Sequence, residues 1–178
     1  MTAKGRENPR GLLPMTRRLR PGDHDMIVQL LHTGRTKRAE MQKLARAIVD
    51  CYGRYGIQVR CQRVDSLTGG DAVHLLRHLG RALGRHVTLC IVDWQIALPH
   101  AGPVFGCATG RSALLSRAGL EEEALMKEAL HEVGHLLALD HCPGECVMSL
   151  SISVEQVKAK PSFLCTRCSA LLESADLD

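Results

Sequence analysis

The most reactive pattern in the sequence is a pair of histidines four residues apart, with a glutamate directly after the first. These residues are His131, Glu132 and His135. On a helix, positions i and i+4 lie on one face, so the two imidazoles can bind a single metal ion. Glu132 can then reach a water molecule on that ion instead of the ion itself. Zinc accepts neutral imidazole ligands, and a catalytic zinc site has three protein ligands and one position open to water.

A third histidine, His141, follows six residues after His135 and would complete the ligand set. It is too far along the chain to share the helix face, so the chain must leave the helix and turn back. The alternative is a core helix that carries surface histidines, and that reading gives Glu132 and His141 no role. The sequence therefore predicts a catalytic zinc site on His131, His135 and His141.

Two cysteine pairs indicate a second metal site. They are Cys142 with Cys146 and Cys165 with Cys168. These spacings suit a closed tetrahedral zinc site with four thiolate ligands, which contributes folding free energy. Two disulfides are the alternative, but they would require an oxidising compartment that nothing else in the sequence supports. Because Cys142 directly follows His141, the structural zinc would also hold the third histidine in place.

The composition favours a cytoplasmic protein. The chain has 178 residues, enough for one domain with a sizeable core, and its apolar content of 45% is ordinary for a globular protein. It has no apolar run of the ~18–20 residues that a membrane helix needs, and no apolar region follows the N-terminal positive charges as in a secretory signal. The four cysteines outside the pairs have no ligand spacing and are expected to be buried free thiols: Cys51, Cys61, Cys90 and Cys107.

The positive charge of the chain is concentrated at its N-terminus. Residues 1–20 contain six lysines and arginines and one glutamate, so the net charge of +4 for the whole chain leaves −1 for the remainder. Binding of nucleic acid needs cations clustered on the folded domain, which disfavours a zinc-ribbon nucleic-acid module. The prolines, glycines and arginines of residues 1–20 predict a flexible arm, with a single domain over residues 21–178.

The hydrophobic pattern predicts alternating strands and helices. Apolar runs indicate strands at 26–31, 57–64 and 87–94. Apolar residues at spacings of three and four indicate helices over 36–52, over 71–83 and from Leu120 through His135. Two short strands, 104–108 and 112–116, would precede the last helix, the first of them as an edge strand. This alternation favours a mostly parallel sheet.

Taken together, the motif resembles that of the archaemetzincins, a branch of the metzincin zinc peptidases. Their pattern is H-E-x-x-H-x-x-G-x-x-H-C, then a second cysteine, a nearby methionine and a C-x-x-C pair. This chain follows it from the first histidine to the last cysteine at all but one position, with Met148 as the methionine, and Lys127-Glu128 before the motif fits as well. The resemblance is dense over residues 103–172 and weaker over 22–102.

The resemblance implies a zinc metallopeptidase with a metzincin-like α+β (mixed α/β) fold. Its N-terminal subdomain, residues 21–140, would contain a twisted, mixed and mostly parallel sheet with a backing helix and the active-site helix. Its small C-terminal subdomain, residues 141–178, would lie below a cleft and contain a final helix and the Met-turn. The Met-turn would place Met148 beneath the catalytic zinc, and the four late cysteines would bind the structural zinc.

One position departs from the family pattern, because Ala138 stands where the family has glycine. Glycine lets the chain turn sharply out of the helix towards His141 with a positive φ. Alanine in the left-handed region costs roughly 1–2 kcal/mol, which metal ligation can offset. We therefore expect either a strained alanine at this turn or a turn of a different kind.

The expected activity is hydrolysis of peptide bonds by a zinc-bound water, with Glu132 as general base. A peptide or protein substrate would lie extended along the edge strand near residues 104–108. Two zinc ions would be the cofactors, and we expect a monomer with no nucleic-acid or membrane partner. The alternative is a catalytically inactive, zinc-stabilised binding protein on the same fold.

Overall fold

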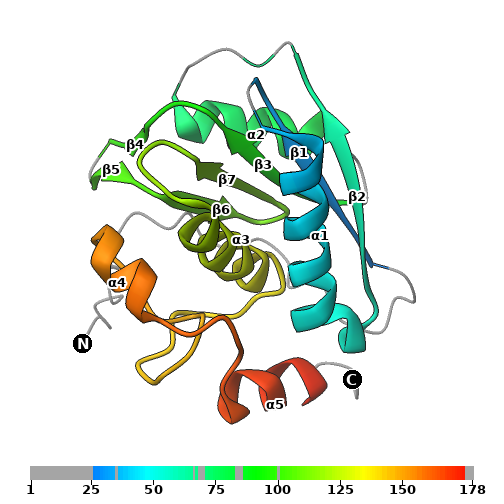
Figure 1. Ribbon diagram of the computed structural model, residues 1–178. Coiled ribbons are helices and arrows are strands. Elements are labelled where there is room, and N and C mark those ends of the chain that lie inside the picture. Colours follow the sequence, from blue (N-terminus) through cyan, green and yellow to red (C-terminus); the bar gives the residue numbers. More distant parts are fainter. Residues whose placement is uncertain are drawn as a thin grey trace, which may run out of the picture.

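A five-stranded β-sheet forms the centre of the computed structural model (Figure 1). The structure describes residues 26–34, 36–65, 67, 71–82, 86–99 and 101–174. The strands lie in the order β2-β1-β3-β7-β6, and neighbours are parallel except β6 and β7, which form an antiparallel pair. Their bounds are β1 Met26–His32, β2 Ile57–Arg63, β3 Val87–Val92, β6 Gly106–Thr109 and β7 Ser112–Ser116.

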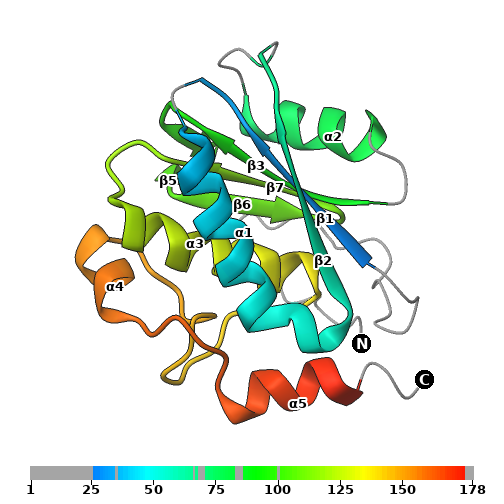
Figure 2. The same ribbon diagram turned by 45° about the vertical axis from the view of Figure 1, so that its right-hand side comes forward.

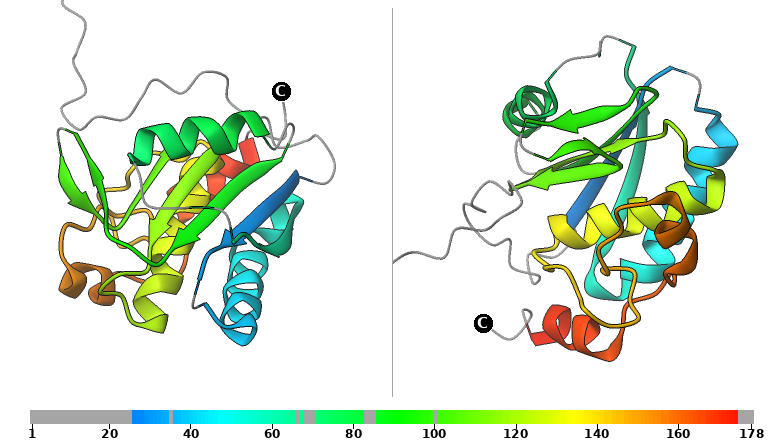
Figure 3. Two further views of the ribbon diagram at one scale, coloured as in Figure 1. Left: turned by 90° about the horizontal axis from the view of Figure 1, so that it is seen from above. Right: turned by 90° about the vertical axis from the view of Figure 1, so that its left-hand side faces the viewer.

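Helices cover both faces of this sheet, which is why β3 is apolar along nearly its whole length. Helices α1 and α3 pack on one face and α2 on the other (Figure 3). In β3, for example, Leu89 belongs to the core under α1 and α3, whereas Cys90 belongs to the core under α2. The bounds are α1 Arg38–Tyr52, followed by a 3-10 turn at Gly53–Tyr55, α2 Ala72–Ala82 and α3 Glu122–Leu136.

The first two helices form where the sequence predicts them. The carboxylate of Asp71 caps α2 by accepting the backbone N–H groups of Val73 at 2.7 Å and His74 at 3.1 Å. Helix α1 buries its predicted apolar stripe, including Leu44 and Ile48. Helix α1 connects β1 to β2 on one face of the sheet, and α2 connects β2 to β3 on the other face. Because each connection crosses over the sheet, β1, β2 and β3 run parallel.

Two short hairpins precede α3, and the sequence predicts only one of them. Strand β4 (Ile96–Leu98) pairs with β5 (Gly102–Val104) in an antiparallel hairpin outside the predicted strands. The strand predicted over 104–108 is therefore divided, because its first residue ends β5 and β6 begins at Gly106. The second hairpin, between β6 and β7, turns at Gly110 as expected, with a φ of +55°.

Helix α3 lies between the sheet and the C-terminal part of the chain (Figures 1 and 2). Helix α4 (Val154–Ala159) packs beside it, and α5 (Thr166–Ser174) lies below the end of α1. Tyr52, at the end of α1, is fully buried, and its hydroxyl donates to the carbonyl oxygen of Leu130 at 2.7 Å. Elements on several sides thus fix α3, which explains how a helix with many polar residues is mostly buried.

The predicted fold class is confirmed, since the chain combines a mostly parallel mixed sheet with helices on both faces. The expectation of buried thiols holds for Cys90 and Cys107 but is wrong for Cys61, which is exposed on the outermost strand β2. Cys51 is half-buried. The arm predicted for residues 1–20 lies outside the described residues. Within the described ranges, no helix has the length and apolarity to cross a membrane.

Candidate metal centres

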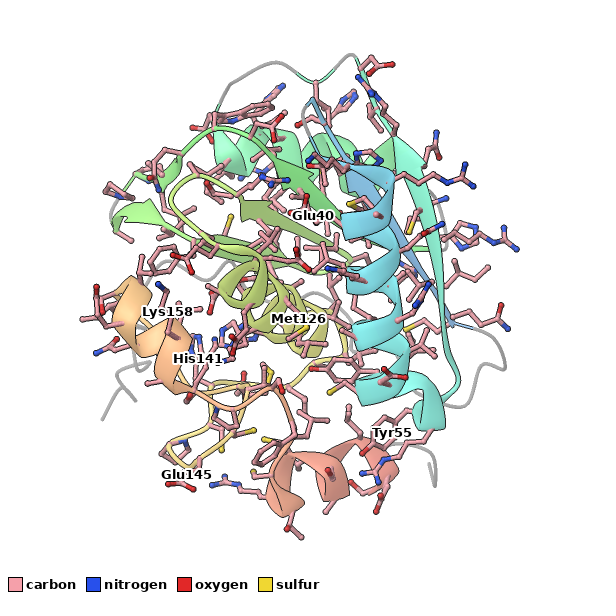
Figure 4. The ribbon with its side chains drawn as sticks, viewed as in Figure 1. Glu40, Tyr55, Met126, His141, Glu145 and Lys158 are labelled. Carbon is pink, nitrogen blue, oxygen red and sulfur yellow. The ribbon has the colours of Figure 1, made fainter. Side chains whose placement is uncertain are left out.

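Three histidines meet at the end of α3, and Figure 4 shows the last of them, His141, beneath that helix. His131 and His135 lie one turn apart on α3, with their Nε2 atoms 3.1 Å apart. The ring of His141 stacks on His131, with centroids 5.3 Å apart, and meets His135 edge-on at 4.8 Å. One nitrogen from each ring lies within 4.8 Å of the others. The structure thus brings the three predicted ligands around one point.

Backbone carbonyl groups set the orientation of the two helical histidines. Nδ1 of His131 lies 2.9 Å from the carbonyl oxygen of Val147, and Nδ1 of His135 lies 2.8 Å from that of Leu139. A carbonyl oxygen can only accept, so Nδ1 is the protonated nitrogen in both rings. The unprotonated Nε2 atoms therefore face the space that the histidines share. This is the usual way in which a protein prepares an imidazole to bind a metal ion.

Ala138 makes the sharp exit from α3 that brings His141 back. Its φ is +64°, the one positive value at a non-glycine residue in the described part of the chain. The N–H of Ala138 donates to His135 at 3.0 Å, and the N–H of Leu139 donates to Gly134 at 2.9 Å. These two bonds form a Schellman motif, which ends a helix with a left-handed residue. The expectation of a strained alanine is confirmed, and a different kind of turn is excluded.

The side chain of Glu132 is buried against the edge strand β6. A Cβ atom at Gly106 would lie 2.2 Å from Oε1 of Glu132, so the carboxylate occupies space that only glycine leaves. Its Oε2 atom is buried without a hydrogen-bond partner among the described residues. Burial and the nearby carboxylate of Glu128 raise the pKa of Glu132, and Lys160 opposes this shift. A buried oxygen of this kind needs a partner, and Glu132 directly follows His131, the first residue of the histidine cluster.

A tight turn over residues 146–149 lies under α3, where the resemblance predicts the Met-turn. The N–H of Ser149 donates to the carbonyl oxygen of Cys146 at 3.0 Å. Met148 is fully buried, and its sulfur packs so closely on Gly134 that a Cβ atom there would lie 2.2 Å away. Because Gly134 directly precedes the second histidine of the motif, the methionine supports the helix at the metal-binding turn.

The four late cysteines form a second cluster, in which all sulfur atoms lie within 4.8 Å of one another. The Sγ atoms of Cys142 and Cys165 are 3.7 Å apart. The backbone N–H of Cys165 donates to Sγ of Cys146 at 3.3 Å, a bond that favours a thiolate. All four thiols are free, so the structure contains no disulfide among them.

The protonation of the histidine cluster suits metal binding, whereas burial raises the thiol pKa of Cys146 and Cys168 in the cysteine cluster. Burial and the neighbouring imidazoles lower the pKa of His131 well below its usual value and that of His135 to about 4, so both rings are neutral near pH 7. Neutral imidazole is the form that binds a metal ion. At Cys165, a backbone hydrogen bond from Cys168 is the main cause that lowers the thiol pKa to about 7. Thiolate is the form of cysteine that binds zinc.

One pair of donor atoms in each cluster has the spacing that zinc would give it. Tetrahedral zinc would separate two nitrogen ligands by roughly 3.3 Å and two thiolate sulfurs by roughly 3.8 Å, given ordinary zinc–ligand lengths. The corresponding separations here are 3.1 Å between Nε2 atoms and 3.7 Å between Sγ atoms. Three imidazoles leave a fourth position open for chemistry, whereas four thiolates close the second site.

The turn over residues 146–149 belongs to both clusters. Its first residue supplies one of the four thiols, and the carbonyl oxygen of Val147 holds the ring of His131. The carbonyl oxygen of Met148 accepts the N–H of Cys142 at 2.9 Å, directly beside the third histidine. A shift of this turn would therefore displace donors in both clusters.

The sequence indicates the candidate ligands but not the groups that orient them. Val147 and Leu139 act through backbone carbonyl groups, which every residue type carries, so no side-chain pattern could identify them. Gly106 interrupts the predicted strand over 104–108 without a visible reason in the sequence. Lys160 has no spacing that relates it to the motif, and only the resemblance drew attention to Lys127-Glu128.

Comparisons with known proteins find similarity to one peptidase family in the part of the chain that carries both clusters. The model of Peptidase family M54 matches residues 118–174, which include all seven candidate ligands. Archaemetzincin from Aeropyrum pernix is 45% identical over 92 residues, which make up 46% of this chain and 50% of that protein. In such alignments the chain spans about half the length of the curated relatives that it matches.

Two solved structures extend the likeness to the rest of the fold. The crystal structure of archaemetzincin from Methanopyrus kandleri aligns with a TM-score of 0.75 and 28% identity, covering 86% of this chain and 97% of that chain. That of archaemetzincin from Archaeoglobus fulgidus aligns with a TM-score of 0.69 and 27% identity, covering 82% of this chain and 99% of that chain. The likeness therefore includes the sheet as well as the motif.

Replacing Ala138 by glycine should stabilise the protein. Glycine removes roughly 1–2 kcal/mol of left-handed strain and adds about 0.5–1 kcal/mol of unfolded-state entropy, so we expect a net gain of about 0.5–1 kcal/mol. Urea unfolding of the zinc-loaded chain measures this change. Ala124→Gly, at a buried position inside α3, is the control and should lose about 1 kcal/mol. A loss of stability at Ala138 as well would show that its strain is negligible.

Proposed function

Because the motif and the fold of this chain are similar to those of the archaemetzincins, we propose that it is a zinc-dependent peptidase that hydrolyses peptide bonds in protein or peptide substrates. One observation carries this proposal. Three imidazoles converge on one point at the end of α3, and the buried carboxylate of Glu132, the residue directly after the first of them, lies against the edge strand β6. The arrangement puts a metal site, a proton acceptor and a surface for an extended chain at one place.

The proposal includes two zinc ions. His131, His135 and His141 would hold the catalytic ion through their ring nitrogens, and Cys142, Cys146, Cys165 and Cys168 would hold the structural ion. When bound at the histidines, zinc supplies Lewis acidity, which acidifies a water molecule and polarises the carbonyl group to be cleaved.

Glu132 would move the protons of the reaction. Its unpartnered Oε2 atom would accept a proton from the attacking water, whose oxygen forms a bond with the carbonyl carbon of the substrate. The same carboxyl group would then give this proton to the amine nitrogen as the C–N bond breaks. Burial raises the affinity of Glu132 for a proton, and a cation among the histidines would oppose that effect. These opposing influences favour a group that both accepts and releases a proton.

The edge strand β6 offers a place for the substrate backbone. Ser116 donates its N–H to the carbonyl oxygen of Phe105 at 2.7 Å, which fixes the phase of the antiparallel pairing between β6 and β7. Because alternate residues face the partner strand, Gly106 and Ala108 turn their backbone N–H and C=O groups towards the open edge. An extended peptide could pair with these groups and would then pass beside Glu132.

The site of action that we propose is the cytoplasm, because four thiolate ligands require a reducing compartment. We also propose a monomer without nucleic-acid or membrane partners, in which residues 21–140 and 141–178 form the two subdomains. The basic residues of the arm leave the remaining chain close to neutral, which supports the exclusion of nucleic acid. An inactive binding protein is not favoured, since the matching family model is that of a peptidase family.

Glu132→Gln tests the proposed mechanism. The amide keeps the size of the side chain but cannot accept the proton, so we expect peptide hydrolysis to fall by about 100-fold or more. Zinc content, measured by mass spectrometry under native conditions, should stay unchanged, because Glu132 is not a proposed ligand. Glu145→Gln, an exposed position on the loop beneath the histidines, should keep wild-type activity. Wild-type turnover in Glu132→Gln would rule the mechanism out.

Gly106→Ala tests the packing of the edge strand on the general base. The new methyl group would meet the carboxylate of Glu132, so the carboxylate must move. Because small displacements of a reacting group are costly, we expect kcat to fall by about 10- to 100-fold with zinc retained. Gly144→Ala is a matched control, since its methyl group would make only an ordinary contact with Cys142 at 3.8 Å. An unchanged kcat in Gly106→Ala would contradict the proposed place of Glu132.

A further inference from the structure

A buried ion pair joins α3 to the C-terminal part of the chain. Nζ of Lys160 lies 2.5 Å from Oε1 of Glu128, and the two side chains are only 3% and 5% exposed. Removing two charges from water costs several kcal/mol per ion, which a buried pair offsets only with good geometry. Apolar residues could fill the same space, so stability alone does not explain why this position has a buried ion pair.

Lys160 stands where the chain leaves α4 and begins its path towards the second cysteine pair. Its backbone N–H closes α4 by donating to Gln156 at 3.1 Å, while its side chain reaches Glu128. Two residues earlier, the carbonyl oxygen of Lys158 accepts a bond of 2.6 Å from Nζ of Lys127. Lys127 and Glu128, adjacent residues of α3, thus hold the segment 158–160 through two separate contacts.

This segment leads directly to the turn that orients His131. The carbonyl oxygen of Phe163 accepts the N–H of Val147 at 2.9 Å, and the carbonyl oxygen of Val147 accepts Nδ1–H of His131 at 2.9 Å. Glu128 and His131 lie three residues apart, on the same turn of α3. A chain of contacts therefore runs from Glu128 on α3 through Lys160, Phe163 and Val147 and back to α3 at His131.

We propose that Glu128 and Lys160 are positioning residues of the histidine metal centre. Their ion pair places the segment after α4, so that Phe163 holds the turn and the turn holds the ring of His131. Neither side chain is one of the proposed metal ligands. The inference rests on the proposed function for its place in the reaction, but its effect on metal binding can be measured without any turnover.

The test uses the full-length chain with Glu128→Leu and Lys160→Met combined. This double variant removes both charges, so no unpaired buried charge remains to unfold the protein. Co²⁺ is the probe, because its thiolate site gives strong charge-transfer absorption and its imidazole site gives weaker bands at longer wavelength. We expect Co²⁺ still to bind the four thiols, with a small shift of the thiolate bands, because the displaced turn also carries Cys146. The imidazole bands should shift, and the affinity of that site should fall by about 10- to 100-fold.

The control is a second partly buried ion pair that is not connected to the turn. Nη1 of Arg117 lies 2.6 Å from Oε2 of Glu40 on α1. Glu40→Leu combined with Arg117→Met should leave both cobalt spectra and both affinities unchanged. Equal weakening of the histidine site in this control would overturn the proposal, because any loss of stability would then have the same effect.

Three other outcomes decide the proposal. Unchanged cobalt affinity and spectrum at the histidines in Glu128→Leu/Lys160→Met would overturn it. If that variant does not bind Co²⁺ at the cysteines, the milder Glu128→Gln/Lys160→Met is measured instead, and failure of both would show a purely structural pair and also overturn it. A wild-type chain that binds Co²⁺ at both clusters but hydrolyses no peptide as the zinc-loaded protein would refute the proposed function and leave this inference standing.

Discussion

The turn over residues 146–149 joins the two candidate metal centres, and the carbonyl oxygen of Val147 is its contact with the histidines. This oxygen holds Nδ1 of His131 at 2.9 Å, which directs the other ring nitrogen towards the neighbouring histidines. The same turn begins with a thiol of the cysteine cluster and carries the methionine that packs beneath α3. The backbone that closes one centre therefore orients the other. A structural zinc held at the cysteines would act on catalysis through this turn, because its ligands fix the position of the carbonyl.

The helix above the turn shows what this arrangement demands. Much of α3 is buried, yet it carries Glu128, His131 and Glu132 in its interior-facing part. Each of these groups is costly to bury without a partner. Glu128 forms an ion pair with Lys160, and His131 bonds to a backbone carbonyl group. Glu132, the residue that we propose as the general base, keeps a buried oxygen without a hydrogen-bond partner among the described residues.

How much the sequence predicts depends on the range of the interaction. His131 and His135 follow from helix periodicity alone, and a sharp turn at Ala138 follows from the need to return towards His141, but only the folded chain shows that this turn is left-handed. The sheet and its helices follow from hydrophobic spacing. By contrast, Val147 and Phe163 act through backbone atoms, and Gly106 acts through the absence of a side chain. Such contacts join distant segments without any local pattern, so only the folded chain reveals them.

The number of zinc ions per chain tests this arrangement most directly, because two centres built on one turn should fill together. The measurement is native mass spectrometry of the full chain purified in the presence of zinc, with reduced thiols. Two zinc ions per chain are expected, and unfolding the protein should release both. A single tightly bound ion, with the histidine or the cysteine cluster left empty at saturating zinc, would contradict the proposed coupling of the two centres.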